Sequence, residues 1–175
     1  KTALLGDEAL LRLLAREKER IWARDPLLMA ETVRRCVTVK GRIVAEDLRE
    51  GGKRAFLNLG HTFAHAVEAV TRYRRWSHGQ AVAWGVMQAA LMSERLGLAD
   101  AGYTRQVSEL IRMYGFDLRL PAPAESILEA MRVDKKRRGG KLRLVLQRGI
   151  GDTVVRTVDP RLVVETLQSG AGNFA

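Results

Sequence analysis

Residues 57–68 have the sequence LNLGHTFAHAVE, in which apolar and polar positions recur with the spacing of a helix. We predict a helix over residues 57–71, on which side chains four positions apart are neighbours. One face of this helix, extended backward, carries five polar side chains: Arg54, Asn58, His61, His65 and Glu68. The opposite face is apolar. This pattern predicts a helix that buries one side and presents the polar side to a cleft.

The rest of the chain has further helical signals. Apolar spacing and boundary residues such as Asp25-Pro26 predict helices over 7–24, 26–47, 79–96, 101–114, 124–131 and 160–168. The 79–96 segment is apolar nearly all round and is expected at the centre of the core. Alternating residues at 141–146 and 153–158 predict a β-hairpin. The expected fold class is mainly α, a helical bundle with one small β-hairpin near the C-terminus, and residues 1–175 form a single domain.

The formal net charge of +10 favours an anionic partner, either nucleic acid or a phosphorylated or carboxylated small molecule. Most Lys and Arg residues are spread along predicted helices, as on a solvated surface. The one dense basic run, residues 135–138, lacks the interleaved aromatic residues of a nucleic-acid site. No apolar run approaches the roughly 18 residues of a membrane span. With a single cysteine, Cys36, the composition predicts a cytoplasmic protein that binds neither nucleic acid nor membranes.

All three histidines of the chain lie within eighteen residues, at His61, His65 and His78. Neutral imidazoles are good zinc ligands, so a metal site is one interpretation. Either His61 and His65 both bind the metal, or one of them binds with His78 while the other transfers protons. Histidines that are hydrogen-bonded without a metal are the third interpretation. Thr62 excludes the metalloprotease motif, which needs a glutamate at that position.

Lys40 lies in register with an apolar stripe of the predicted 26–47 helix. In one interpretation, its alkyl stem runs along the helix and the ammonium reaches the surface. In the other, the ammonium points into the same cleft as Arg54 and binds an anion. The spacing alone leaves both open.

The segment 57–68 resembles the signature of 3-dehydroquinate synthases. The resemblance extends over nearly the whole chain, through residues 40–54 (KGRIVAEDLREGGKR), 76–79 (WSHG), 134–136 (DKK) and 142–151 (LRLVLQRGIG). It implies a phosphate-releasing lyase that converts 3-deoxy-arabino-heptulosonate 7-phosphate to 3-dehydroquinate. This is a step of the shikimate pathway, which leads to chorismate and the aromatic amino acids. The implied cofactors are NAD and Zn²⁺ or Co²⁺.

The resemblance also implies roles for individual residues. His61 and His78 correspond to metal ligands, and His65 corresponds to a histidine that transfers a proton near the departing phosphate. The other implied substrate-binding or catalytic residues are Lys40, Glu50, Arg54, Asn58 and Lys136, with Lys135 as the alternative to Lys136.

Two parts of the family pattern would precede residue 1. The third metal ligand of the family is a glutamate in a Glu-x-x-Lys segment whose lysine aligns with Lys1. The N-terminal NAD-binding domain would also come before it, and is therefore an expected partner. The isolated chain is expected to be inactive and to bind zinc poorly. The other expected partner is a phosphorylated sugar-acid substrate, and a homodimer is a candidate assembly because family members are commonly dimers.

Two residues depart from the family pattern: Ala64 replaces a usual glycine and Gln80 a usual glutamate. Three alternatives therefore stand beside the synthase. One is a related sugar-phosphate cyclase, one is a non-catalytic basic binding module, and one is an inactive homologue. Arg54, Asn58 and Lys136 favour the synthase over its cyclase relatives.

Overall fold

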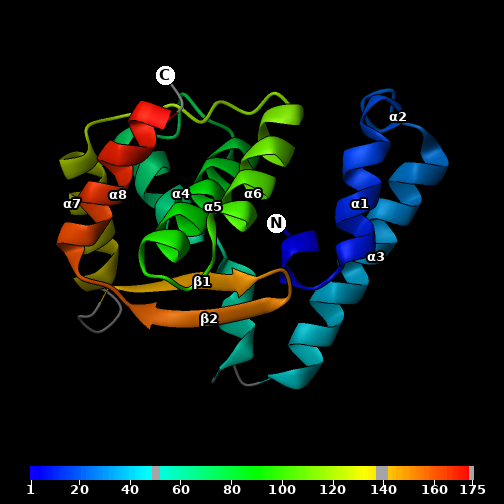
Figure 1. Ribbon diagram of the computed structural model, residues 1–175, viewed down its shortest axis with the longest axis horizontal. Coiled ribbons are helices and arrows are strands. Elements are labelled where there is room, and N and C mark those ends of the chain that lie inside the picture. The colour runs from blue at the N-terminus through cyan, green and yellow to red at the C-terminus, as the bar shows by residue number, and fades with distance from the viewer. Residues whose placement is uncertain (49–51, 137–141, 174–175) are drawn as a thin grey trace.

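Helix α5 (His78–Arg95) lies at the centre of the molecule (Figure 1), as its apolar sequence predicts. The computed structural model describes residues 1–48, 52–136 and 142–173. A capping box begins α5: the Ser77 side chain accepts from the backbone N–H of Gln80, and the Gln80 side chain accepts from the backbone N–H of Ser77. Gln80, which departs from the family pattern, therefore stabilises the start of the central helix.

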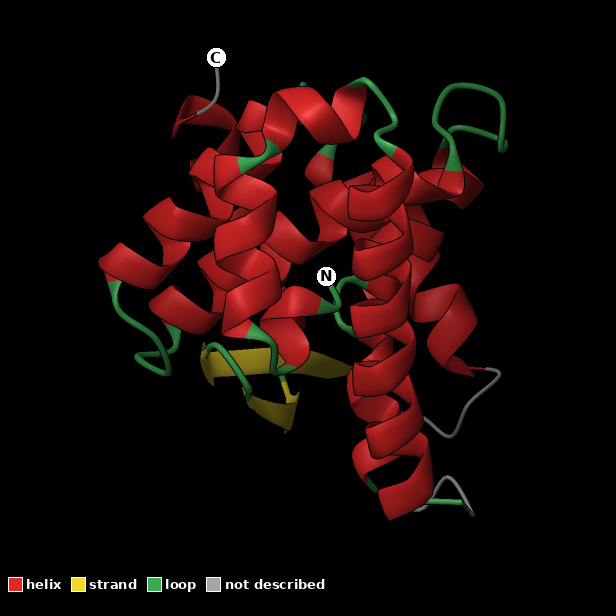
Figure 2. Cartoon of the chain, turned by 90° about the vertical axis from the view of Figure 1, so that its right-hand side faces the viewer, coloured by secondary structure: helices red, strands yellow, loops and turns green. Residues whose placement is uncertain are grey.

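Helices α4 (His61–Val70), α6 (Ala101–Met113) and α8 (Pro160–Asn173) and a hairpin pack against α5, and α7 (Ala124–Lys136) packs on α4 and α8. Strands β1 (Arg143–Gly149) and β2 (Asp152–Thr157) pair antiparallel, with Val145 opposite Val155. The strand β1 contacts α5, so the hairpin closes one end of the bundle (Figures 1 and 2). The mainly helical fold with one hairpin is confirmed.

The N-terminal elements form one side of the molecule. They are the 3₁₀ helix η1 (Ala3–Leu5), α1 (Glu8–Arg16), α2 (Lys18–Trp22) and α3 (Pro26–Glu46). Figure 2 faces this side, and the long helix α3 runs down the front. Asp25 caps α3 by accepting from the backbone N–H groups of Leu27 and Leu28, and Pro26 follows at the first helical position.

Several predicted boundaries were wrong. The predicted helix over 7–24 is two helices, α1 and α2, separated at Glu17. The predicted helix over 57–71 begins only at His61, because Gly60 has a left-handed backbone with φ of 80°. Residues Lys53–Asn58 form a separate 3₁₀ helix, η2. Helices α7 and α8 extend beyond their predicted ends at 131 and 168.

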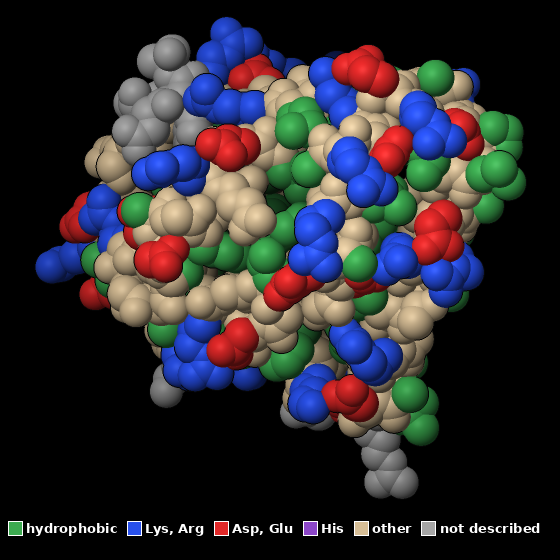
Figure 3. Space-filling view, turned by 45° about the vertical axis from the view of Figure 1, so that its right-hand side comes forward, with side chains coloured by type: hydrophobic (Ala, Val, Ile, Leu, Met, Phe, Trp, Pro, Cys, Tyr) green, Lys and Arg blue, Asp and Glu red, His purple; other side chains and the backbone are tan. Residues whose placement is uncertain are grey.

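Charged side chains of both signs share the surface. Figure 3 shows Lys and Arg interleaved with Asp and Glu on the face that it presents, rather than gathered in one basic patch. Exposed ion pairs such as Arg12–Glu8 and Arg119–Asp117 account for part of this pattern. Within the described ranges, no helix combines the length and the apolar character that crossing a bilayer requires.

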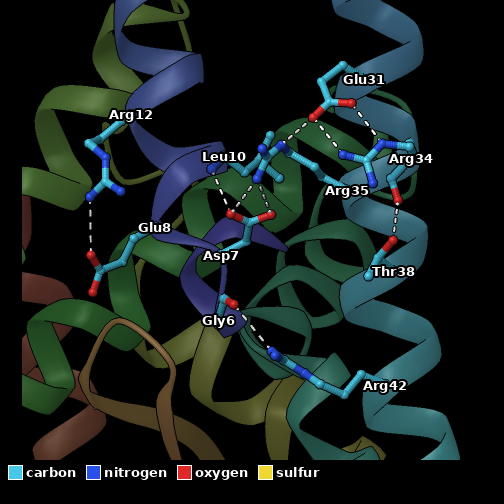
Figure 4. Close-up of polar contacts among 10 residues, drawn as sticks. All are labelled: Gly6, Asp7, Glu8, Leu10, Arg12, Glu31, Arg34, Arg35, Thr38 and Arg42. Atoms are coloured by element: carbon cyan, nitrogen blue, oxygen red, sulfur yellow. Dashed lines mark hydrogen bonds and ion pairs between the residues drawn. The ribbon is translucent and has the colours of Figure 1, made fainter.

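Asp7 joins the start of α1 to α3 (Figure 4). Its carboxylate accepts from the backbone N–H of Leu10 at 2.8 Å and from the guanidinium of Arg35 at 3.1 Å. Arg35 also pairs with Glu31 on its own helix. Burial of Asp7 opposes its charge, but the hydrogen bonds from Leu10 and Arg35 and the charge of Arg35 outweigh burial and lower the pKa of Asp7. The network fixes α3 beside α1.

Replacing Asp7 tests this junction. We expect Asp7→Ala to lower the free energy of unfolding by about 1–2 kcal/mol, because the helix cap and the ion pair are both lost. The folded pKa of Asp7 is below the unfolded value of about 4. The stabilisation is therefore present above that value and is lost as the pH falls through the folded pKa. Urea unfolding at neutral and acidic pH measures both effects.

Glu8→Ala is the matched control, because Glu8 forms only an exposed pair with Arg12. It should change stability little at any pH. Equal effects of the two substitutions at neutral pH would contradict the proposed junction.

Candidate functional site

The three histidine rings come together at one end of α4 and α5. His61 is the first residue of α4, His65 follows one turn later, and His78 is the first residue of α5. The ring centroids are 5.7 Å apart for His61 and His65, 5.4 Å for His61 and His78, and 6.4 Å for His65 and His78. The clustering in the sequence is therefore also a clustering in space.

Close backbone packing places the start of α4, which carries His61, against the middle of α5. A Cβ atom on Gly60 would lie 2.7 Å from the backbone nitrogen of Val86 and 2.8 Å from its Cγ2. A Cβ atom on Gly85 would overlap the carbonyl oxygen of Gly60. Only glycine permits this approach, and the left-handed conformation of Gly60 also favours glycine. The two glycines therefore fix where His61, the residue after Gly60, lies against α5, the helix that His78 begins.

Both His61 and His78 use Nδ1 for a hydrogen bond within the protein. Nδ1 of His61 lies 3.2 Å from the carbonyl oxygen of Leu59, and Nδ1 of His78 lies 2.8 Å from Oε1 of Glu68. Because these acceptors require a proton on Nδ1, the Nε2 atom of each neutral ring carries the lone pair. Neither Nε2 has a hydrogen-bond partner among the described residues.

The donor set fits part of a metal site. Two imidazoles with free Nε2 lone pairs are zinc-type ligands. No group of three or more His, Cys, Asp or Glu within the described residues is placed to hold a metal ion. The described part of this chain therefore offers two nitrogen ligands, and further ligands would have to complete the coordination.

The pKa of His61 is lowered, chiefly by burial of the ring. The Leu59 carbonyl opposes this shift, and the charges of Lys1, His65 and His78 add to it. The neutral form that ligates a metal is therefore favoured at His61 near neutral pH.

Lys1 lies beside the histidines. Together with His61 and His78 it lines a pocket of about 420 Å³ whose remaining walls are mostly apolar side chains of α5 and α6. Its ammonium donates to the carbonyl oxygen of Leu57 at 2.8 Å. Burial and then the charge of Lys40 lower the pKa of Lys1, while Cys36 opposes the shift. Lys1 and Lys40 thus repel each other, and an anion near both would relieve that repulsion.

The hairpin holds the segment that carries Lys1. The carbonyl oxygen of Leu4 accepts from the side-chain amide of Gln147 at 2.7 Å and from the backbone N–H of Gly151 at 2.8 Å. Gln147 is fully buried and also accepts from the hydroxyl of Tyr103. From the sequence, Lys1 had no predicted role beyond an alignment position, because this long-range contact has no local signal.

The other candidate residues do not form the predicted continuous stripe. Arg54 and Asn58 lie on η2, outside α4, and Glu68 turns into the protein toward His78. That part of the prediction was wrong because Gly60 interrupts the helix. Lys40 is exposed on α3, against which η2 packs, so Lys40 and Arg54 come from neighbouring elements.

Some candidates are outside what the structure describes. Glu50 lies outside the described residues, and so do the side chains of Lys135 and Lys136 at the end of α7. Ala64 is fully buried in the core, where the backbone of α4 meets Gly85 of α5. Its methyl group is therefore part of the helix packing.

The sequence of this chain is similar to members of one protein family. The family model described as 3-dehydroquinate synthase C-terminal matches residues 1–137. A 3-dehydroquinate synthase of Halorhodospira halophila (strain DSM 244 / SL1) is 43% identical over 169 residues, covering 95% of this chain and 48% of the relative. A 3-dehydroquinate synthase of Acidithiobacillus ferrooxidans (strain ATCC 53993 / BNL-5-31) is 40% identical over 171 residues, which cover 97% of this chain and 47% of the relative. The chain spans about half the length of these relatives.

Solved structures share the fold. The 2-epi-5-epi-valiolone synthase ValA from Streptomyces hygroscopicus subsp. jinggangensis 5008, with NAD⁺ and Zn²⁺ bound, has a TM-score of 0.86 and 24% identity, covering 98% of this chain and 49% of that chain. A 2-deoxy-scyllo-inosose synthase complexed with carbaglucose-6-phosphate, NAD⁺ and Co²⁺ has a TM-score of 0.73 and 24% identity. The match covers 83% of this chain and 42% of that chain. At this identity the likeness shows the fold alone.

Gly60→Ala tests the helix contact that forms the site. We expect the free energy of unfolding to fall by about 2 kcal/mol or more, because a left-handed conformation costs an L-residue about 1–2 kcal/mol and the new Cβ would overlap Val86. Urea unfolding measures the loss, and NMR signals of the His61 and His78 rings should shift.

Gly41→Ala is the control, because a Cβ atom at this exposed position in α3 meets nothing within 4 Å. It should raise stability by up to about 1 kcal/mol through helix propensity. The packing explanation would be wrong if Gly60→Ala were as well tolerated as Gly41→Ala.

Proposed function

Because the chain belongs to the 3-dehydroquinate synthase C-terminal family, we propose that it is the metal- and substrate-binding part of a 3-dehydroquinate synthase. The proposed reaction converts 3-deoxy-arabino-heptulosonate 7-phosphate to 3-dehydroquinate and phosphate, a lyase step of the shikimate pathway. One observation carries the proposal: the rings of His61 and His78 lie close together, and on both rings Nδ1 is hydrogen-bonded within the protein while Nε2 is available to a metal. NAD and the remaining metal ligand would come from a separate N-terminal domain.

The histidines would divide the chemistry between them. His61 and His78 would hold Zn²⁺ or Co²⁺ through Nε2, and a bound ion would polarise the substrate hydroxyl that is oxidised. The His65 ring lies 5.7 Å from His61 and 6.4 Å from His78, measured between ring centroids. It is close enough to act on the same substrate, and we assign it proton transfer near the departing phosphate.

Cationic side chains would hold the two acidic groups of the substrate. Lys40 and Arg54 come from neighbouring elements, and the charge of Lys1 acts on both Lys40 and His61. Fixed cations hold a phosphate most strongly where water is excluded. We place Lys40, Arg54, Asn58, Glu50 and Lys136 in this substrate site.

A related sugar-phosphate cyclase is the second candidate, because the solved structures with this fold are cyclases of other names. Identities of 40–43% to named 3-dehydroquinate synthases, against 24% to those structures, favour the synthase. On the face that Figure 3 presents, the interleaving of basic and acidic side chains weighs against a basic module for nucleic acid.

Zinc titration by calorimetry tests the histidine pair in this chain. We expect weak but measurable binding of one Zn²⁺ per chain, and His61→Ala should weaken it at least about tenfold, since the loss of even an outer-shell partner has that effect. The weakness would follow because the described residues place only His61 and His78 as ligands with a free Nε2.

Cys36→Ser is the control, because the half-buried thiol of Cys36, the one cysteine of the chain, is another side chain that can bind zinc. It should leave zinc binding unchanged. Binding that survived His61→Ala but disappeared in Cys36→Ser would assign the metal to the thiol and refute the histidine site.

We expect turnover to need the other half of the length that the curated relatives have. In a chimera, the N-terminal half of the Halorhodospira halophila enzyme is joined to residue 1 of this chain and supplied with NAD and metal. We expect phosphate release from 3-deoxy-arabino-heptulosonate 7-phosphate, none from the isolated chain, and a fall in kcat of about 10²–10⁴-fold in His65→Ala.

Gly41→Ala in the same chimera should retain full activity, since the added Cβ atom would meet nothing within 4 Å in this chain. If the folded chimera released phosphate only from a hexose 6-phosphate, the cyclase alternative would replace the synthase.

A further inference from the structure

Glu68 is a buried carboxylate with one side-chain partner among the described residues. It lies on α4 with 6% of its surface exposed, and its Oε1 accepts from Nδ1 of His78 at 2.8 Å. A buried carboxylate is retained only where a partner compensates its lost hydration. The sequence placed Glu68 among groups facing a cleft, but the structure turns it toward His78 and leaves it without an assigned role.

The hydrogen bond restrains a side chain that is otherwise open to solvent. His78 begins α5, and 60% of its side chain is exposed, whereas only 8% of the Glu68 side chain is exposed. The fixed partner is therefore the carboxylate, which is held by the packing of α4. Without Glu68, the His78 ring could rotate about its side-chain bonds and exchange Nδ1 for Nε2.

The same bond selects the tautomer. A carboxylate can only accept from a ring nitrogen, so it keeps the proton on Nδ1 and the lone pair on Nε2. The Leu59 carbonyl does this for His61, but a carboxylate partner also makes the imidazole a stronger donor to a metal. Both rings thus leave Nε2 available to a metal: His61 through the Leu59 carbonyl, and His78 through the Glu68 carboxylate.

We propose that Glu68 is a positioning residue that holds the His78 ring and its tautomer so that Nε2 lies beside the metal-binding nitrogen of His61. This inference rests on the proposed function and deepens it, because it adds a residue outside the predicted ligand and substrate set. The backbone carbonyl of Glu68, which accepts from the N–H of Tyr73 at 2.8 Å, ends α4 independently of the side chain. Replacing the side chain therefore leaves this helix end intact.

The first test needs no metal. Long-range ¹H–¹⁵N NMR spectra of the imidazoles, recorded where the rings are neutral, report which nitrogen of each ring carries the proton. In the wild-type chain His78 should be protonated on Nδ1. In Glu68→Met, which fills a similar volume without leaving a buried charge, His78 should shift largely to the Nε2-protonated form while His61 keeps its own tautomer.

Gln88→Met is the matched control. Gln88 is a buried polar residue of α5 with 2% exposure, and its Oε1 has no hydrogen-bond partner in the described part of the chain. The substitution should leave all three histidine tautomers unchanged. Circular dichroism and urea unfolding establish that each variant is folded. Should Glu68→Met be unfolded, Glu68→Leu takes its place, since it also removes the acceptor without leaving a buried charge.

Zinc affinity is the second readout. Folded Glu68→Met should bind Zn²⁺ about 10–100-fold more weakly than the wild type, and Gln88→Met should bind it equally well. An unchanged His78 tautomer in folded Glu68→Met would overturn the proposal, even if zinc still bound to His61 and His78. A tautomer that depends on Glu68 in a chain that binds no zinc would support the positioning role and count against the metal-binding function instead.

Discussion

The backbone contact between Gly60 and Gly85 is the constraint on which the site depends. It allows α4 to begin directly against α5, with no side chain between them. His61 follows Gly60 directly, so the contact also fixes where His61 lies against α5, the helix that begins at His78. The left-handed turn at Gly60 further separates η2 from α4, which puts Arg54 and Asn58 on a different element from the histidines.

Other parts of the structure hold the cations near this contact. The hairpin fixes the carbonyl of Leu4 through Gln147 and Gly151, and η1 thereby carries Lys1 to the pocket beside His61. The Asp7–Arg35 pair holds α3, which carries Lys40, beside α1. Buried or half-buried polar contacts thus hold both η1, which carries Lys1, and α3, which carries Lys40. Residues of the central helix α5 line the pocket beside Lys1.

Much of this fold could be predicted from local signals. The Asp25-Pro26 cap, the apolar α5 segment and the alternating hairpin strands each gave the correct element, because capping and periodicity are properties of neighbouring residues. The break at Glu17 and the late start of α4 were missed. Nothing in an apolar spacing pattern indicates that Gly60 will adopt a left-handed backbone and lie where an added Cβ atom would meet Val86.

The same limit applies to the site. The three histidines were predicted to act together from their proximity in the sequence, and the structure brings them together. The pairing of Glu68 with His78 was not predicted, because it depends on how the chain returns between α4 and α5. The proximity of Lys1 to Lys40 was missed for the same reason, since 39 positions separate them in the sequence.

The most direct test of the account is anomalous diffraction at the zinc edge from crystals of this chain soaked in zinc. The account predicts one strong peak between His61 and His78, about 2.0–2.1 Å from the Nε2 atom of each ring. Zinc bound through Nδ1 of either histidine, zinc at Cys36, or no zinc at the two histidines would contradict the proposed metal site.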